Sequence, residues 1–401
     1  MSDSPKLSNR ADIMPASPIR KLVPLADAAK TRGIKVYHLN IGQPDLSTPD
    51  SFWNAIRNYK EKVLAYGHSQ GLPFYRDNLA GYYQRLGYNV DPDDIVITTA
   101  GSEAIIFSMM AICEQGEEII VPEPFYTNYN GFAVMAGVKL VPVTCNVEKG
   151  YHLPPKKEIE KLITAKTKAI LYCSPNNPTG AVFTKDEIQM LADLAIEHNL
   201  FLLADEVYRE FVYEGKHTSI FEIEGIEKRA VLLDSISKRY SACGARVGCI
   251  VTKNGELIDT FIRFGQARLC PPTLEQTGAN AALSEGAEYF DRTMSEYKRR
   301  RDTVYEMLME IDGVVCLKPS GAFYIMAKLP VDNTDNFARW MLTDFNYNGA
   351  TTMVAPGSGF YATPDVGLDE ARLAYVLNVD DLRKAMNILK IGIEQYNGSR
   401  T

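Results

Sequence analysis

Short apolar runs, each followed at once by small or polar residues, recur along the first two thirds of the chain. The clearest have the length and residue types of buried strands, and they cover 95–99, 118–121, 168–173, 200–204 and 230–233, with a returning strand at 249–252. Amphipathic helical patterns separate them, as at 104–112 and 185–198. Strands that alternate with helices predict an α/β fold with a mainly parallel, doubly wound sheet.

The pattern changes from about residue 313, where shorter strand patterns precede and follow a helical one. Strands are expected at 314–317, 322–326 and 371–376, with helices at 336–344 and 380–396. This texture predicts a smaller α+β domain. We therefore expect an N-terminal segment (1–44) that joins the small domain, a large domain (45–297) and a small C-terminal domain (298–401).

Three local features accompany this division. A helix is expected to begin at Ser17-Pro18, although Pro24 would kink or interrupt it. One long helical stretch is expected over 275–308. Within it, the basic run 298–301 is interpreted as a solvated helix face.

Polar residues stand just after the carboxyl ends of the predicted strands. In an open α/β sheet ligands bind at that edge. The residues placed there are expected to converge although they are far apart in sequence, and they are Ser102, Asn177, Asp205, Ser235 and Lys238. After the strand 95–99, Gly101, Ser102 and Glu103 open a helix, whose free amides favour an anion such as phosphate. Many such turns bind nothing, so this turn alone is weak evidence.

Lys238 lies past the end of a buried strand, eight residues before Arg246. Partial burial and a neighbouring cation both lower a lysine's pKa and make its amine nucleophilic. Two serine hydroxyls and an arginine suit a phosphate monoester. Together these groups suggest pyridoxal phosphate. A lone Ser-x-Ser-Lys would more often be a surface loop, so the longer context decides.

That context is the run Ser-Ile-Ser-Lys-Arg-Tyr-Ser-Ala-Cys-Gly-Ala-Arg-Val-Gly at 235–248. It resembles the lysine signature of the class I/II pyridoxal-phosphate-dependent aminotransferases of fold type I. The turn 174–180, Ser-Pro-Asn-Asn-Pro-Thr-Gly, resembles a second hallmark of that family. The resemblance implies the fold-type-I architecture over nearly the whole chain from about Ser17, with Lys238 carrying the cofactor and Ser235 and Arg246 holding its phosphate.

The resemblance also implies roles for residues whose plain structural explanations would otherwise be preferred. Asp205, alone a helix N-cap, would hold the pyridine nitrogen, and Tyr208 and Asn177 would bond the ring oxygen. Tyr126 would stack on the ring. Gly42 and Arg372, which alone would be interpreted as a turn glycine and an edge-strand arginine, would bind the substrate carboxylate together with Asn177. Tyr66, which alone would be interpreted as a packing residue, would contact the cofactor phosphate of the other subunit of a homodimer.

The implied activity is ping-pong transfer of an amino group from an L-amino acid to a 2-oxo acid such as 2-oxoglutarate, with Lys238, Asp205 and Tyr208 as catalytic residues. Aspartate or glutamate is the favoured donor, with aromatic and alanine-type donors close behind. Some aspartate enzymes carry a lysine where Ser102 stands, so Arg20, Arg263 or Arg268 would have to bind a distal carboxylate. A lyase on the same cofactor is the alternative enzyme. A cofactor-sensing regulator would need a DNA-binding domain, for which the first twenty residues leave no room.

Composition excludes several other classes of protein. The net charge of −7 argues against nucleic acid or an anionic membrane as a partner. The seven cysteines have no metal-ligand spacing, so we expect no bound metal. We expect these cysteines to be reduced thiols. No secretory signal or membrane-spanning run is present. We expect a cytoplasmic enzyme that acts on small molecules.

Overall fold

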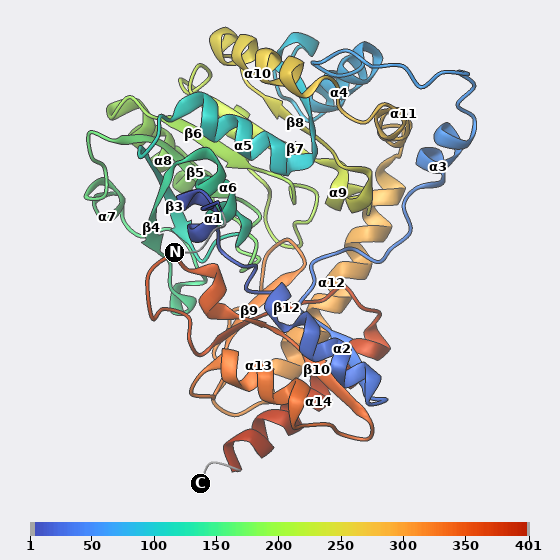
Figure 1. Cartoon of the computed structure of the whole chain (residues 1–401), viewed down its shortest axis with the longest axis vertical. Coiled ribbons are helices and arrows are strands. Elements are labelled where there is room, and N and C mark those ends of the chain that lie inside the picture. Colours follow the sequence, from blue (N-terminus) through green and yellow to red (C-terminus); the bar gives the residue numbers. More distant parts are fainter. Residues whose placement is uncertain (1–4, 399–401) are drawn as a thin grey trace.

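A computed structural model describes residues 5–398 and divides them between a large sheet unit and a smaller unit (Figure 1). The large unit holds a seven-stranded sheet in the order β2-β8-β7-β6-β5-β3-β4. Only β8 runs antiparallel to its neighbours. The strands are β2 (Ile95–Thr99), β3 (Glu118–Glu123), β4 (Lys139–Thr144), β5 (Thr167–Cys173), β6 (Phe201–Asp205), β7 (Ala230–Ser235) and β8 (Val247–Val251).

Helices cover both faces of this sheet, as a doubly wound fold requires. Alternate strand residues pack into two separate cores. One core includes Ile97, Ile170 and Leu202 and the other includes Leu171 and Leu203. The helices of this unit are α3 (Asp50–Arg57), α4 (Pro73–Arg85), α5 (Ala100–Ile112), α6 (Asn128–Ala136), α7 (Lys156–Glu160), α8 (Lys185–Glu197), α9 (Ile236–Arg239), α10 (Gly255–Arg268) and α11 (Thr273–Ala282).

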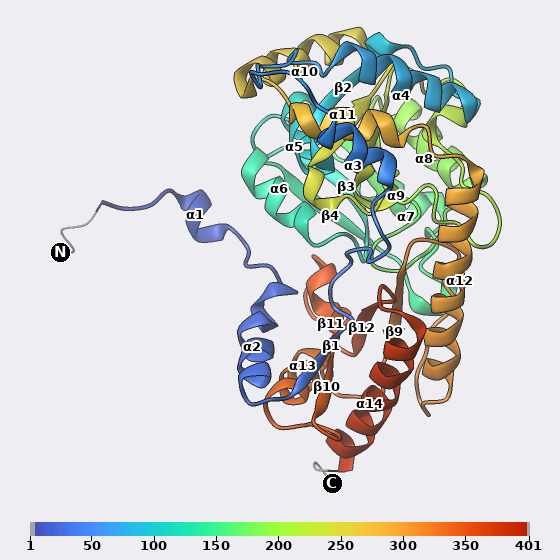
Figure 2. The same ribbon diagram turned by 90° about the vertical axis from the view of Figure 1, so that its right-hand side faces the viewer.

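The smaller unit combines distant parts of the chain. β1 (Lys35–His38) pairs in parallel with β10 (Ala350–Met353), while β11 (Ala355–Pro356), β12 (Glu370–Ala374) and β9 (Tyr324–Lys328) form an antiparallel sheet. Around them lie α2 (Val23–Thr31), α13 (Thr334–Thr343) and α14 (Val379–Gly398), and α1 (Asn9–Ile13) precedes the unit. Figure 2 shows α12 (Ala287–Met309) running alongside both units. The proposed boundary after residue 297 falls inside this helix.

Two expected helices differ in their limits. The stretch 275–308 is two helices, because α11 ends at Ala282 and α12 begins only after Gly286. The N-terminal helix α2 starts at Val23, after a 3₁₀ turn. Pro24 therefore occupies its first turn, where a missing N–H costs no helical hydrogen bond.

The basic run 298–301 is not a uniformly solvated face, so that interpretation was wrong for two of its residues. The side chains of Arg300 and Arg301 are only 3% and 1% exposed. Arg300 donates to the carbonyl of Val376 and pairs with Asp45, and Arg301 donates to the carbonyl of Pro319. A guanidinium tolerates burial when oxygens meet its N–H groups.

Across residues 5–398, we find no helix that is both long enough and apolar enough to cross a membrane.

Candidate active site

The first group of residues that we expect to bind the phosphate lies at the end of β2. Helix α5 begins at Ala100, four residues earlier than expected, so the amides of Gly101 and Ser102 belong to its first turn. β8 approaches this turn closely: a Cβ on Gly248 would lie 2.6 Å from the Gly101 nitrogen. Glu103 uses its carboxylate internally, since it accepts from the Thr99 amide at 2.7 Å and pairs with Arg268 at 3.1 Å. Its carboxylate is therefore engaged within the protein.

Lys238 stands on the short helix α9 that follows β7. Its Nζ donates to the Gly42 carbonyl at 2.8 Å and lies 3.7 Å from the Cys243 sulfur. Burial lowers the pKa of Lys238, and the nearby charges of Arg372 and Arg246 lower it further, while Cys243 acts in the opposite direction. A larger share of this amine is therefore neutral and nucleophilic than in an exposed lysine.

The groups expected to hold a phosphate flank Lys238. The Ser235 hydroxyl caps α9 by accepting from the Ser237 amide, and it donates to the Val247 carbonyl. The Ser237 hydroxyl lies 2.8 Å from that of Ser235. Arg246 is exposed in a left-handed conformation (φ 54°), with its guanidinium bonded to the Cys243 carbonyl. A serine pair and an accessible guanidinium thus occur together, as the phosphate assignment requires.

Asp205, the last residue of β6, is a buried carboxyl without a basic side chain bonded to it. Its Oδ2 accepts from the Tyr129 hydroxyl at 2.6 Å, and its Oδ1 lies 3.4 Å from the Val207 amide. Burial raises the pKa of Asp205 to about 6, against the opposing effect of these hydrogen bonds. Tyr126 is half-buried, with its ring edge-to-face to Tyr129 at 5.5 Å. Sequence reasoning missed Tyr129, because helix position alone gives no signal for it.

Arg372 of β12 meets the large unit through Asn177. Its guanidinium donates to the Asn177 Oδ1 at 3.0 Å and to the Asn40 carbonyl at 2.5 Å. It lies between the rings of Tyr324 and Phe360, at 4.6 and 4.9 Å from their centroids. Burial lowers the pKa of Arg372, opposed by nearby tyrosines. Neither aromatic residue was expected from the sequence, where both look like ordinary core positions.

Tyr208 and Gly42 complete the buried cluster. The Tyr208 hydroxyl is 2.8 Å from that of Tyr324 and accepts from the Asn177 Nδ2 at 3.5 Å. Gly42 has no space for a side chain, since a Cβ there would lie 1.9 Å from the Tyr324 hydroxyl. Its carbonyl bonds Lys238 instead. In contrast, Tyr66 is 80% exposed on the segment between α3 and α4, outside this cluster.

The residues present fit pyridoxal phosphate by three observations. The Nε of Arg372 and the Nδ2 of Asn40 are buried without a hydrogen-bond partner, so polar capacity is left for an anionic ligand. Asp205 is a buried acid to which a protonated ring nitrogen would supply a cation. Lys238 is the half-buried amine that such a cofactor needs.

Comparisons with known proteins agree with this arrangement. The pattern of the family "Aminotransferase class I and II" matches residues 34–387. The chain belongs to the class I and II aminotransferases. Aromatic-amino-acid aminotransferase 2 of Thermococcus litoralis is 32% identical over 391 residues, covering 95% of this chain and 96% of that protein. Aspartate aminotransferase of Pyrococcus abyssi is 31% identical over 395 residues, covering 95% and 96%.

The fold of this aminotransferase has close structural counterparts as well. Alanine aminotransferase from Pyrococcus furiosus superposes with a TM-score of 0.90 at 32% identity, covering 97% of this chain and all of that one. The neighbours are fold-type-I aminotransferases, which confirms the expected fold class. The family is generally pyridoxal-phosphate-dependent and acts on amino acids and oxo acids. The three similar proteins differ in the donor that their names give.

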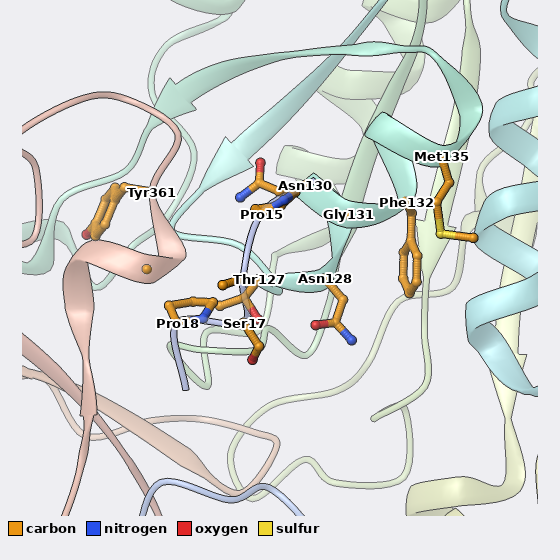
Figure 3. Close-up of a pocket in the computed structure, with 12 residues that line it drawn as sticks. Pro15, Ser17, Pro18, Thr127, Asn128, Asn130, Gly131, Phe132, Met135 and Tyr361 are labelled. Carbon is orange, nitrogen blue, oxygen red and sulfur yellow. The ribbon is translucent and has the colours of Figure 1, made fainter. Parts of the chain in front are cut away.

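A cavity of about 310 Å³ lies beside the site, between residues 15–18 and the start of α6 (Figure 3). Ser17, Asn128 and Phe132 are among the residues that line it. Asn128 also donates to the Tyr126 hydroxyl at 2.8 Å. The cavity therefore adjoins the edge of Tyr126, whereas Lys238, Asp205 and Arg372 are not part of its lining.

The raised pKa of Asp205 predicts how the stability of the cofactor-free aminotransferase depends on pH. The carboxyl ionises at about pH 4 in the unfolded chain but only at about pH 6 in the folded protein, so stability that is fully present below about pH 4 is lost as the pH rises to about 6. Asp205→Asn cannot ionise, so its stability relative to wild type should increase by about 1.4 kcal/mol between pH 5 and pH 8. Thermal or urea unfolding of the two cofactor-free proteins at both pH values measures this.

The exposed Asp259→Asn on α10 is the matched control, and its difference from wild type should not change with pH. An Asp205→Asn difference that is the same at both pH values would contradict the raised pKa.

Proposed function

We propose that this aminotransferase binds pyridoxal phosphate through Lys238 and moves an amino group from an L-amino acid to a 2-oxo acid in a ping-pong reaction. The observation that carries the proposal is the gathering of three polar groups around one sheet edge. They are the half-buried amine of Lys238, the buried carboxyl of Asp205, and the guanidinium of Arg372, which reaches this edge from β12 through Asn177. Each matches one part of the cofactor or substrate, and the Nε of Arg372 has no hydrogen-bond partner among residues 5–398.

The phosphate is assigned to the α5 amides of Gly101, Ser102 and Glu103, together with Ser235 and Arg246. A helix N-terminus and a guanidinium both favour an anion, the latter with bidentate geometry. The pairing of Glu103 with Arg268 keeps its negative charge compensated beside that anion.

The ring is assigned to Tyr126, Asn177, Asp205 and Tyr208. When bound, the cofactor supplies an electron sink for the bond-breaking step at the substrate Cα. Asp205 would hold a proton at the ring nitrogen. Burial raises the pKa of Asp205, and the positive charge of a protonated ring nitrogen would stabilise its carboxylate. Asn177 and Tyr208, already joined at 3.5 Å, present donors toward the ring oxygen.

The substrate α-carboxylate is assigned to Arg372, with Asn177 and the Gly42 backbone beside it. The two aromatic rings hold the planar guanidinium of Arg372 in position, and its Nε, which has no hydrogen-bond partner among the described residues, is available to a carboxylate. With the substrate Cα held nearby, the Lys238 amine would remove the Cα proton as general base and return it as general acid.

Aspartate or glutamate, with 2-oxoglutarate as acceptor, is the favoured pair. Of the three arginines considered for a distal carboxylate, Arg268 pairs with Glu103 and Arg263 bonds Thr260 on exposed α10. Arg20 is exposed, and its charge lowers the pKa of Tyr126 against the larger effect of burial. Arg20 is therefore our candidate. Aromatic or alanine-type donors, or a lyase reaction, are the alternatives that the following experiments separate.

The cofactor assignment predicts a visible absorbance band in the purified enzyme. Single amino acids should convert it to a pyridoxamine-like spectrum, and 2-oxoglutarate should restore it. Borohydride should fix cofactor covalently to the wild type, as mass spectrometry of the Lys238 peptide detects, but not to Lys238→Ala. Exposed Lys298→Ala is the control and should retain the cofactor. Bound cofactor without reversible conversion by any donor would favour a lyase.

The assignment of Arg20 predicts a change in donor preference. Arg20→Ala should lower kcat/KM for aspartate and glutamate about 10- to 100-fold, because one charge-assisted contact is lost. The value for alanine or phenylalanine should change little, and exposed Arg10→Ala should change neither. Steady-state kinetics with the four donors measures the ratio. Equal losses for all donors would remove Arg20 from the distal site.

A homodimer is the proposed assembly. Val63, Leu64 and Tyr66 are 73%, 59% and 80% exposed on the segment between α3 and α4, an apolar surface that a second copy would cover. Light scattering should give twice the 44.7 kDa chain mass. Tyr66→Phe should remain dimeric and bind cofactor less tightly, since a phosphate hydrogen bond is lost. A monomeric wild type would refute this arrangement.

A cytoplasmic location is also part of the proposal. All seven cysteines are free thiols in the structure, which supports a reducing compartment.

A further inference from the structure

A buried group of charges lies directly behind the site. Arg239 and Arg209 both approach the same oxygen of Asp234: the Arg239 Nη2 donates a hydrogen bond to its Oδ2 at 2.5 Å, and the Arg209 Nη2 lies 2.7 Å from that oxygen as an ion pair without hydrogen-bond geometry. All three residues are at most 6% exposed. Glu210 completes this charge network, since its Oε1 accepts from the Arg239 Nε at 2.7 Å.

Each member of the central trio is the chain neighbour of a proposed site residue. Arg209 follows Tyr208, Arg239 follows Lys238, and Asp234 precedes Ser235. The Ser235 amide also donates to the Asp234 Oδ1 at 2.7 Å. One carboxylate therefore connects the backbone segments of the phosphate group, the cofactor lysine and the ring-oxygen donor.

Two tyrosines of α4 enclose the network. The Tyr83 hydroxyl donates to the Asp234 Oδ2 at 2.8 Å, and the Tyr82 hydroxyl donates to Glu210. The Arg239 guanidinium lies 4.5 Å from the centre of the Tyr82 ring, and that of Arg209 lies 5.1 Å from Tyr83. The two guanidinium groups thus meet the carboxylates of Asp234 and Glu210 away from water, with the Glu206 carboxylate 3.8 Å from the Arg209 Nη1. Removal of one of these groups leaves a buried charge uncompensated.

We propose that Asp234 is a positioning residue of the active site: by binding Arg209 and Arg239 together, it fixes the Tyr208 segment against the helix that carries Lys238. The inference rests on the proposed function, because it assigns these two residues to the cofactor. No residue of the network is assigned to cofactor or substrate, so its effect passes through the neighbouring backbone.

Geometry favours this role over stabilisation alone. A buried ion pair often stabilises a fold no better than apolar residues of the same volume would. It does hold its partners at a fixed distance and angle, and catalytic groups displaced by about 1 Å lose about 100-fold in rate. Arg209 and Arg239 converge on a single oxygen, so movement of either segment would break a contact.

The test uses Asp234→Asn in the full-length, cofactor-loaded enzyme. We expect kcat to fall about 10- to 100-fold while KM for 2-oxoglutarate stays within about threefold. The pH midpoint of the visible cofactor band should move by at least about 0.5 unit, because the surroundings of Lys238 change. Glu187→Gln is the matched control: its carboxylate binds His152 and two backbone amides around α8, remote from the proposed site residues. It should lower Tm with kcat and midpoint unchanged.

A second variant covers the case in which Asp234→Asn does not fold. Arg239→Lys keeps the positive charge but cannot bind Asp234 and Glu210 through a planar fork. It should lower kcat about 5- to 20-fold and move the spectral midpoint. If either folded variant keeps both wild-type kcat and the wild-type midpoint, Asp234 is only structural and the inference is overturned.

A readout without cofactor separates this inference from the proposed function. In cofactor-free protein, the pH dependence of Lys238 labelling by trace acetic anhydride gives its titration midpoint by peptide mapping. Loosening of α9 in Asp234→Asn or Arg239→Lys should move that midpoint up, toward an exposed lysine. A wild type without transamination would refute the function while leaving this comparison valid, and an unchanged midpoint would refute the positioning role.

Discussion

The desolvation of charge at one sheet edge is the constraint on which the rest of the structure depends. Lys238, Asp205 and Arg372 are each removed from water, which penalises the ionised form of every one of them. Such groups persist only where the surrounding fold is stable enough to carry their cost. Here that support is a sheet covered on both faces by helices, with these polar groups gathered near its strand ends.

The smaller unit contributes to this edge through very few atoms. Arg372 reaches Asn177 across the contact between the units, and the Gly42 carbonyl reaches Lys238. Tyr324 lies beside both contacts, within 3.5 Å of the Gly42 oxygen and 2.8 Å of the Tyr208 hydroxyl. The site is therefore shared by both units, and the position of the small unit sets the distance between Lys238 and Arg372.

Sequence patterns were sufficient to predict the fold class and the residues that follow the strands. Strands can be recognised from short stretches of sequence, and ligands of open α/β sheets bind at the carboxyl ends of those strands. They could not show Tyr129 or Tyr324, whose importance comes only from what they meet in space. They also misjudged Arg300 and Arg301, since a run of basic residues on a helix gives no sign that oxygens from distant segments will cover two of them. Cofactor roles for Ser235, Arg246 and Tyr66 came from the family resemblance, because a serine, an arginine and a tyrosine in a loop carry no such signal on their own.

Helix α12 has a mechanical consequence. Its 23 residues form an unbroken rod about 35 Å long that lies against both units. Because this helix is continuous, the connection that it makes between the two units is not a flexible linker. A movement of the small unit that brought Arg372 nearer to Lys238 would therefore have to bend this helix or shift the packing along it.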